Sequence, residues 1–284
     1  MTLPLEAAAL VLLAAFFHAS WNALLKAGAD RLAVLAIANA AGVVIALVAV
    51  PFVPVPLAPS WPFLFASIVL HTGYYAFLIH AYRYGDLSHV YPLARGLSPL
   101  LVAALAAVFA SETLPPGGLA GVALACAGIA SLAFDSSRPW RSDRRPLAYA
   151  AGTALFIAAY TLADGMGVRR AGEPLAYIVW LMLLDGWPIL AFTLWARRGR
   201  LAEALASSWA SGCASGALQF AAYGLVIWAM NLGAMAAVSA LRETSVIFAA
   251  AIGALILKER FGARRIAAAV LVASGIVLMR VADL

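Results

Sequence analysis

Ten apolar stretches, each about as long as a helix needs to cross a bilayer, make up most of this sequence. Such a helix needs roughly 20 apolar residues to cross about 30 Å of hydrocarbon, where lipid offers no partners to unsatisfied backbone groups. The strands of a membrane barrel would alternate polar and apolar residues, and these stretches do not. We therefore predict an all-α integral membrane protein of ten transmembrane helices. Numbered in chain order, the predicted spans are 4–26, 32–52, 61–82, 88–110, 115–134, 146–168, 174–196, 206–230, 235–257 and 262–281.

The composition agrees with this prediction. Of the 284 residues, 65% are hydrophobic and only 11% are charged, which is more apolar surface than a water-soluble core of this size could bury. Cys126 and Cys213 both lie within apolar stretches, so we expect neither a disulfide nor a metal site. The first stretch lacks a basic leading segment, and we interpret it as a retained helix rather than a signal peptide.

A repeat relates the two halves of the sequence, because a shift of 147 residues superimposes several polar positions. Arginine and glutamate are scarce within the apolar stretches, so their equal spacing in both halves carries more weight than matches between alanines. The superimposed residues are Arg95 on Arg242, Ser98 on Ser245, Glu112 on Glu259 and Gly128 on Gly275.

This repeat predicts the organisation of the chain. We expect a first five-helix repeat at 1–137, a basic connecting loop at 138–145 and a second five-helix repeat at 146–284, which together form one transport domain. Five spans per half is an odd number, so the second copy enters the membrane upside down. Inverted repeats of this kind are typical of secondary transporters, whose substrate sites lie near the bilayer midplane between the repeats.

The basic residues predict the orientation in the membrane. Fourteen lysines and arginines fall on one side of the predicted spans and three on the other, although the net charge is only +6. Cytoplasmic connections carry the excess of such residues. We therefore expect both termini outside the cytoplasm, in a bacterial-type inner membrane. The three on the terminal side are Arg169, Arg170 and Arg280.

Polar side chains within the spans are the candidate site residues, because burying them in hydrocarbon is costly. His18, Trp21 and Asn22 share one helical face in the first span, and Tyr75 and Tyr82 belong to an aromatic stripe in the third. Each pattern predicts a substrate-contacting face. The alternatives are interhelical hydrogen bonding for the first and aromatic packing or an interfacial belt for the second.

The remaining candidates come from both halves. Arg95 and Arg242 lie deep enough for one of them to bind a substrate carboxylate, and the alternative is that their long stems reach the membrane surface. Glu243 projects in a different direction from Arg242 and need not neutralise it. The predicted lining residues are His18, Trp21, Asn22, Tyr75, Tyr82, Arg95, Ser98, Tyr160, Tyr223, Arg242 and Ser245.

Three acids receive other interpretations. Asp185 is the most central acid, and we favour a partner for a neighbouring polar group over a proton carrier. Glu112 and Glu259 follow the fourth and ninth spans, where we expect them to anchor connections between helices.

Two segments resemble EamA-type members of the drug/metabolite transporter superfamily. They are YPLARGLSPLLVAALAAVFASETLPPGGLAGVALACAGIASLAF and SALRETSVIFAAAIGALILKERFGARRIAAAVLVASGIVLMRV. The stretches HASWNALLK and HTGYYAFLIHAYRYGDLSHVYPL most resemble YddG-type exporters of aromatic amino acids. The resemblance implies a basket of ten helices with a central cavity lined by spans 1, 3, 4, 6, 8 and 9.

These observations predict a secondary transporter that exports small amphipathic metabolites, most of all amino acids including aromatic ones, by alternating access. It would act as a monomer in lipid, with no cofactor and no nucleic-acid partner. One alternative is drug efflux by proton antiport, weakened because Glu6 lies at the edge of the first span, and another is a channel. An intramembrane enzyme is disfavoured, although the stretch CASG weakly resembles a rhomboid serine motif. No nucleotide-binding or zinc-protease motif occurs.

Overall fold

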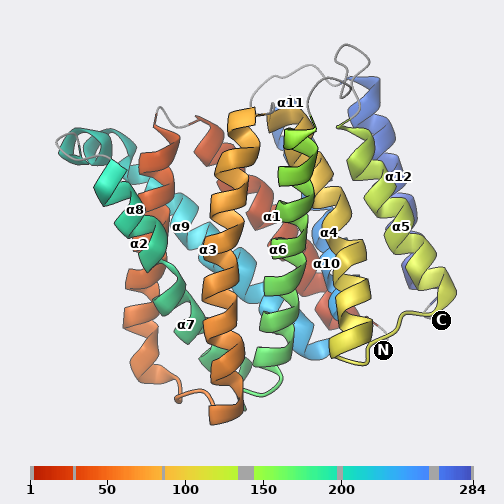
Figure 1. The fold of residues 1–284 in the computed structure, drawn as a ribbon, viewed down its shortest axis with the longest axis horizontal. Helices are drawn as coiled ribbons and strands as arrows, with labels where there is room; N and C mark the ends of the chain where they lie inside the picture. The colour runs from red at the N-terminus through yellow and green to blue at the C-terminus, as the bar shows by residue number, and fades with distance from the viewer. Residues whose placement is uncertain are drawn as a thin grey trace.

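The computed structural model describes residues 3–27, 30–84, 87–133, 144–196, 201–255 and 262–282, and the regular structure within these ranges is helical (Figure 1). In chain order, the α-helices are α1 (Leu5–Ala27), α2 (Arg31–Ala49), α3 (Trp61–Tyr84), α4 (Leu87–Phe109), α5 (Pro116–Ser131), α6 (Arg145–Val168), α7 (Pro174–Asp185), α8 (Trp187–Ala196), α9 (Leu201–Leu232), α10 (Met235–Arg242), α11 (Ser245–Leu255) and α12 (Ala263–Ala282). Two short 3₁₀ helices, η1 (Val50–Phe52) and η2 (Ala58–Ser60), lie between α2 and α3.

The described helices form ten apolar spans, as the sequence predicts. Eight are long and apolar enough to cross a bilayer, and two shorter apolar helices, Pro116–Ser131 and Ile266–Ala282, make up the rest. Two spans are interrupted in a way the hydropathy does not reveal. The seventh is divided into α7 and α8 at Gly186, just before Pro188, which has no backbone N–H to donate. The ninth is divided into α10 and α11 after Arg242.

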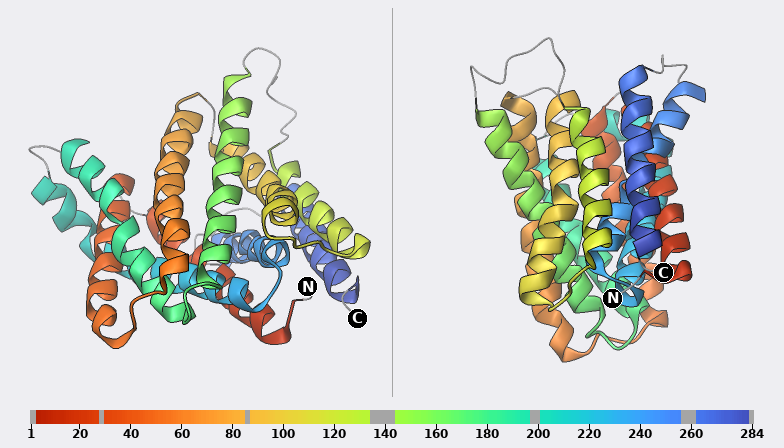
Figure 2. Two further views of the ribbon diagram at one scale, coloured as in Figure 1. Left: turned by 60° about the horizontal axis from the view of Figure 1, so that its bottom comes forward. Right: turned by 90° about the vertical axis from the view of Figure 1, so that its right-hand side faces the viewer.

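The packing of the helices relates the two halves. Helix α3 packs along α6, and its counterpart α9 packs along α1; likewise α4 packs along α6, and its counterparts α10 and α11 pack along α1. Exchanging the halves converts each pair into the other. In Figures 1 and 2 the described chain begins and ends at one end of the bundle, whereas α6 begins at the opposite end. This is the inverted arrangement that five spans per half require. Most of the predicted connecting loop, 138–145, lies outside the described residues.

The last helices of the two halves, α5 and α12, pack closely together. A Cβ atom at Gly121 would lie 2.5 Å from the carbonyl oxygen of Gly275, and one at Gly275 would lie 2.5 Å from that of Gly121. Any side chain at either position would push the helices apart, and small residues are common where membrane helices approach so closely.

Large hydrophobic side chains remain exposed along the outside of the bundle. Val69, Val108 and Val270 are among them. In water such surface would be costly to leave uncovered, whereas lipid tails solvate it readily. The polar side chains that the helices bury are therefore the ones that need a physical explanation.

Candidate functional site

A buried ion pair links the two halves in the interior. Arg95 of α4 donates from Nε to Glu243 Oε2 at 3.1 Å, and its Nη2 lies 2.8 Å from Oε1. The Glu243 side chain has no exposed surface. The first contact is a hydrogen bond, whereas the second is an ion-pair contact without hydrogen-bond geometry, so one edge of the guanidinium faces both carboxylate oxygens.

Arg242, the repeat counterpart of Arg95, is also buried but is not paired in this way. Its residue is 4% exposed, and its Nε and Nη2 atoms have no hydrogen-bond partner among the described residues. Tyr160 of α6 forms a side-chain hydrogen bond with it. Neither arginine extends to the membrane surface, so the alternative of a snorkelling side chain is wrong for both. Glu243 pairs with Arg95, although it is adjacent to Arg242 in the sequence.

His18 of α1 lies within electrostatic range of both arginines. Its Nε2 atom is buried without a hydrogen-bond partner in the described part of the chain. Its ring packs edge-on against Trp21, with centroids 5.4 Å apart. Asn22 instead donates to the carbonyl of His18 at 2.7 Å, within the same helix. The first-span face therefore contributes the imidazole of His18 to what we call the basic cluster, which comprises Arg95, Arg242, Glu243 and His18, and the indole of Trp21 lies beside it.

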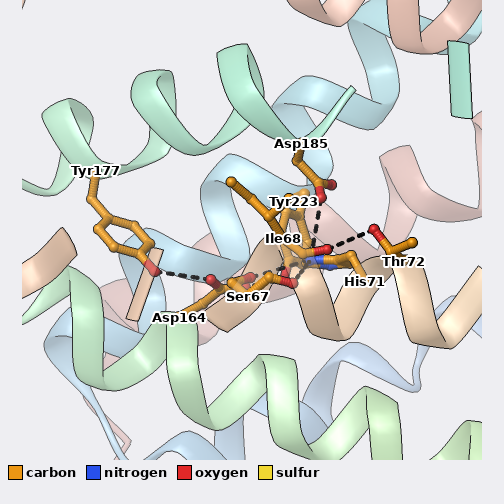
Figure 3. A network of polar contacts seen from close by, with 8 residues as sticks. All are labelled: Ser67, Ile68, His71, Thr72, Asp164, Tyr177, Asp185 and Tyr223. Atoms are coloured by element: carbon orange, nitrogen blue, oxygen red, sulfur yellow. Dashed lines mark hydrogen bonds and ion pairs between the residues drawn. The ribbon is translucent and has the colours of Figure 1, made fainter. Parts of the chain in front are cut away.

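A second cluster, which we call the acidic cluster, comprises Asp164, His71, Ser67 and Asp185 (Figure 3). Fully buried Asp164 accepts hydrogen bonds from Tyr177, at 3.0 Å, and from Tyr223. The Ser67 hydroxyl is a further partner of Asp164. Three hydroxyl groups from three different helices thus surround this one carboxylate, and such charge-assisted hydrogen bonds are the stronger kind.

His71 connects this network to Asp185. Its Nδ1 lies 3.1 Å from the carbonyl oxygen of Ser67 and 3.2 Å from the hydroxyl oxygen of the same residue, and the tautomer of the ring sets which of the two it bonds. Asp185 Oδ1 is 3.7 Å from the same nitrogen, too far for a hydrogen bond, and has no hydrogen-bond partner in the described residues. The position beside His71 agrees with our interpretation of Asp185 as a partner for a neighbouring polar group.

Aromatic rings connect the two clusters. Tyr160, which hydrogen-bonds Arg242, stacks on His71 with centroids 4.0 Å apart and planes at 20°. Tyr223 and Tyr74 both meet Tyr160 edge to face, and Tyr75 lies beside Tyr74 at 5.2 Å. The interior between the halves therefore has a basic part and an acidic part with aromatic surface between them.

Several predicted lining residues meet in this interior, and others do not. His18, Arg95, Arg242, Tyr160 and Tyr223 join the clusters, with Trp21 and Tyr75 beside them. Ser98 is fully buried and donates to the carbonyl of Arg95 at 3.1 Å, while Ser245 is buried at the start of α11. Tyr82 lies in the last turns of α3, and its side chain is outside the described part of the structure.

The sequence prediction omitted several residues from the lining. Asp164 could have been included, since it is an acid within an apolar span and shares a helical face with Tyr160. The pairing of Glu243 has no local signal, because its partner lies 148 residues away. The other residues of this interior that the prediction omitted are Ser67, His71, Tyr177 and Asp185.

A third polar group lies at the end of the bundle where the described chain begins and ends. Glu112 accepts from the backbone N–H of Met235 at 3.0 Å and pairs with Arg169. Arg169 also donates to the carbonyl oxygens of Met230, at 2.9 Å, and Gly233, at 2.7 Å. This end cluster ties together three connections from both halves, which confirms the prediction that Glu112 anchors a connection. Glu259 lies outside the described residues.

Comparison with known proteins identifies a family and a solved structure that resemble this chain. The model of the EamA-like transporter family matches residues 5–134 and 144–281. A solved structure, described only as "Crystal structure of protein", is 18% identical and superimposes with a TM-score of 0.74, covering 96% of this chain and 95% of that one. At this identity the structural likeness concerns the fold alone. No curated protein matches the sequence.

Proposed function

Because this chain belongs to the EamA-like transporter family, a group of membrane transporters of small metabolites, we propose that it exports amino acids, including aromatic ones. The observation that carries the proposal is the interior described above, where the basic and the acidic cluster lie on either side of stacked aromatic rings. An amino acid with an apolar side chain has the matching features: a carboxylate, an ammonium group and a hydrophobic body.

The cost of burial supports a role in binding. Charged groups in the membrane interior are expensive and usually face a substrate pathway or one another. Aromatic surface attracts apolar and aromatic side chains at ring separations of about 4.5–7 Å. A site that combines both suits a small amphipathic ligand better than a purely apolar drug.

Alternating access follows from the relation between the halves. Each half packs its first and third helices against those of the other, as α1 with α9 and α3 with α6. In our proposal the halves rock against each other along these contacts, so the shared interior opens to one side at a time. The proposed lining comprises His18, Trp21, Asn22, Tyr75, Tyr82, Arg95, Ser98, Tyr160, Tyr223, Arg242 and Ser245.

Uptake of labelled phenylalanine into proteoliposomes tests the proposal. We expect Trp21→Ala and Tyr75→Ala to slow uptake about three- to tenfold, since a lost aromatic contact is worth about 0.5–1.5 kcal/mol. Trp209→Ala is the matched control, because Trp209 is 63% exposed on the outside of the bundle. Normal uptake by both interior variants at normal protein yield would remove them from the site.

The acidic cluster supports a second candidate, efflux driven by proton antiport. Asp185 lies 3.7 Å from His71, and Asp164 lies within electrostatic range of the same imidazole. A proton could therefore be held among three titratable groups, with Tyr177 and Tyr223 facing Asp164. Repeating the uptake assay with and without a pH gradient separates the two mechanisms. Antiport predicts that the gradient accelerates transport and that Asp185→Asn abolishes the acceleration; facilitated transport predicts no response to the gradient.

We also propose a bacterial-type inner membrane, with both termini outside the cytoplasm. What supports this is that α1 begins and α12 ends at the end of the bundle that has few basic residues. A reporter active only in the periplasm, fused to the C-terminus, should be active. Silence of that fusion, together with activity of a cytoplasmic reporter at the same position, would reverse the orientation.

A further inference from the structure

We propose that Arg242, and not its repeat counterpart Arg95, binds the carboxylate group of the substrate. This inference rests on the proposed function, because it names one subsite of the same pathway. It depends on the unequal surroundings of two arginines that the repeat makes equivalent.

One edge of the Arg95 guanidinium is occupied by Glu243, although its Nη2 makes an ion-pair contact there and no hydrogen bond. Its Nε and Nη2 atoms, which point in the same direction, contact the two oxygens of Glu243. This edge-on geometry is the one in which arginine binds a carboxylate through two parallel hydrogen bonds. Glu243 therefore occupies the part of Arg95 that a substrate carboxylate would use.

The same edge of Arg242 is available to a ligand. Its Nε and Nη2 atoms are buried and have no hydrogen-bond partner among the described residues. An unpaired buried donor is costly, and a charged one costs more, so an anion that binds at this edge would offset the cost of burying it. The buried Nε2 of His18, also without a partner in the described chain, is a second polar atom in the same cluster.

The packing of α4 against α5 accounts for the difference between the two arginines. The residue after Arg242 is Glu243, and the residue after Arg95 is Gly96. A Cβ atom at Gly96 would lie 2.9 Å from the backbone nitrogen of Ala130 and 3.0 Å from the carbonyl oxygen of Cys126. No glutamate fits at position 96, so the two arginines have a single neighbouring carboxylate, that of Glu243, and it pairs with Arg95.

The charge balance of the basic cluster specifies the kind of anion. Two guanidinium groups and one carboxylate leave a single positive charge, which one monoanionic group neutralises. A carboxylate has that charge and the planar pair of oxygens that the arginine edge fits. A phosphate dianion would leave the cluster negative, so we expect it to bind more weakly.

Thermal unfolding of the purified protein in detergent tests ligand binding without transport. The probes are 3-phenylpropionate, which has only the carboxylate, phenylalaninamide, which has only the ammonium group, and inorganic phosphate. We expect 3-phenylpropionate to raise the melting temperature of the wild type and to bind Arg242→Gln at least about tenfold more weakly. Phosphate should shift the melting temperature less than 3-phenylpropionate does. A larger shift with phosphate would overturn the assignment to a carboxylate.

The matched control removes the other arginine together with its partner. The double variant Arg95→Gln/Glu243→Gln keeps Arg242 and leaves no unpaired charge at the Arg95 position. We expect it to retain preferential stabilisation by 3-phenylpropionate over phenylalaninamide. The proposal is overturned if Arg242→Gln keeps this preference, or if the double variant loses it as fully as Arg242→Gln does. Arg242→Lys, which keeps the charge without the planar edge, replaces Arg242→Gln if the latter fails to fold, with weakened binding expected.

Transport separates this inference from the proposed function. If the wild type carries no amino acid but 3-phenylpropionate stabilises it through Arg242, the amino-acid proposal fails and the carboxylate subsite stands. If it transports phenylalanine and Arg242→Gln discriminates phenylalanine from phenylalaninamide as the wild type does, the subsite fails and the transporter proposal stands.

Discussion

The interior and the terminal end of the bundle each hold an arginine close to a carboxylate, and the hydrogen-bond donors of the two arginines are satisfied very differently. Arg169, at the end, donates to Glu112 and to two backbone carbonyls. Arg242, in the interior, keeps two nitrogens without partners in the described residues. The contrast distinguishes two uses of a cation in one bundle: a fully bonded arginine fastens connections together, and a partly bonded one is a site for a ligand.

The carboxylates at the two places differ in the same way. Glu112 serves one arginine and one backbone amide, which are its own local partners. Glu243 lies between two arginines and pairs with only one of them. Substitutions should therefore affect stability at both places but ligand recognition only in the interior.

Glu243→Ala should have the largest effect. The variant leaves Arg95 and Arg242 buried together without a carboxylate, and breaking such a pair from one side costs about 3–5 kcal/mol. The free energy of unfolding in mixed micelles measures the loss. Arg95→Gln/Glu243→Gln, which removes both charges, should recover most of it. A loss no greater than that of an exposed substitution such as Glu6→Ala would mean that the pair does not stabilise the interior.

Glu112→Ala should be the next most harmful, at about 2 kcal/mol. The loss is smaller because the Arg169 side chain is 22% exposed and keeps its two carbonyl partners, so water compensates in part. The same unfolding assay applies, with Glu6→Ala as the exposed control. If the end cluster only fastens the connections, the variant still prefers 3-phenylpropionate over phenylalaninamide. Loss of that preference would contradict the division between the two regions.

How far the sequence predicts this molecule depends on the range of the interactions involved. The spans and the repeat follow from composition and from the spacing of scarce charged residues, such as Arg95 with Arg242. Hydropathy is averaged over many residues, so it does not locate the interruption at Gly186, where a Cβ atom would lie 2.6 Å from the Val43 side chain and a proline follows two residues later.

The site itself was predicted only in part, for the same reason. Helical spacing groups His18 with Trp21, and the acid at Asp164 with Tyr160, because these groupings are local. It cannot pair Arg95 with Glu243 or bring Tyr177 and Tyr223 to Asp164, since those contacts join helices from distant parts of the chain. The tertiary fold decides which polar groups remain unsatisfied.

Tyr177→Phe extends the comparison to the acidic cluster. It removes one of the hydroxyl donors to Asp164 without leaving a cavity, and a hydrogen bond to a charged group is worth about 1.5 kcal/mol at the low end. Tyr223→Phe removes another donor. Because both donors serve one carboxylate, the loss of unfolding free energy in the double variant should differ from the sum of the two single losses. Strict additivity of the unfolding free energies would show that the hydroxyls do not act on Asp164 together.

Ser98→Ala should have the smallest effect. It tests whether a buried polar group that is already hydrogen-bonded contributes to ligand binding. The sequence suggested Ser98 as a lining residue, equivalent by repeat to Ser245. Its hydroxyl is fully buried and already donates to a carbonyl of its own helix, a bond worth about 0.5 kcal/mol. Ser98 then contributes to the lining by its position and little by its hydroxyl, so Ser98→Ala reduces phenylalanine uptake by no more than about twofold, whereas Arg242→Gln reduces it further. A loss of uptake in Ser98→Ala as large as in Arg242→Gln would mean that satisfied and unsatisfied groups contribute alike, and the distinction between the two arginines would lose its basis.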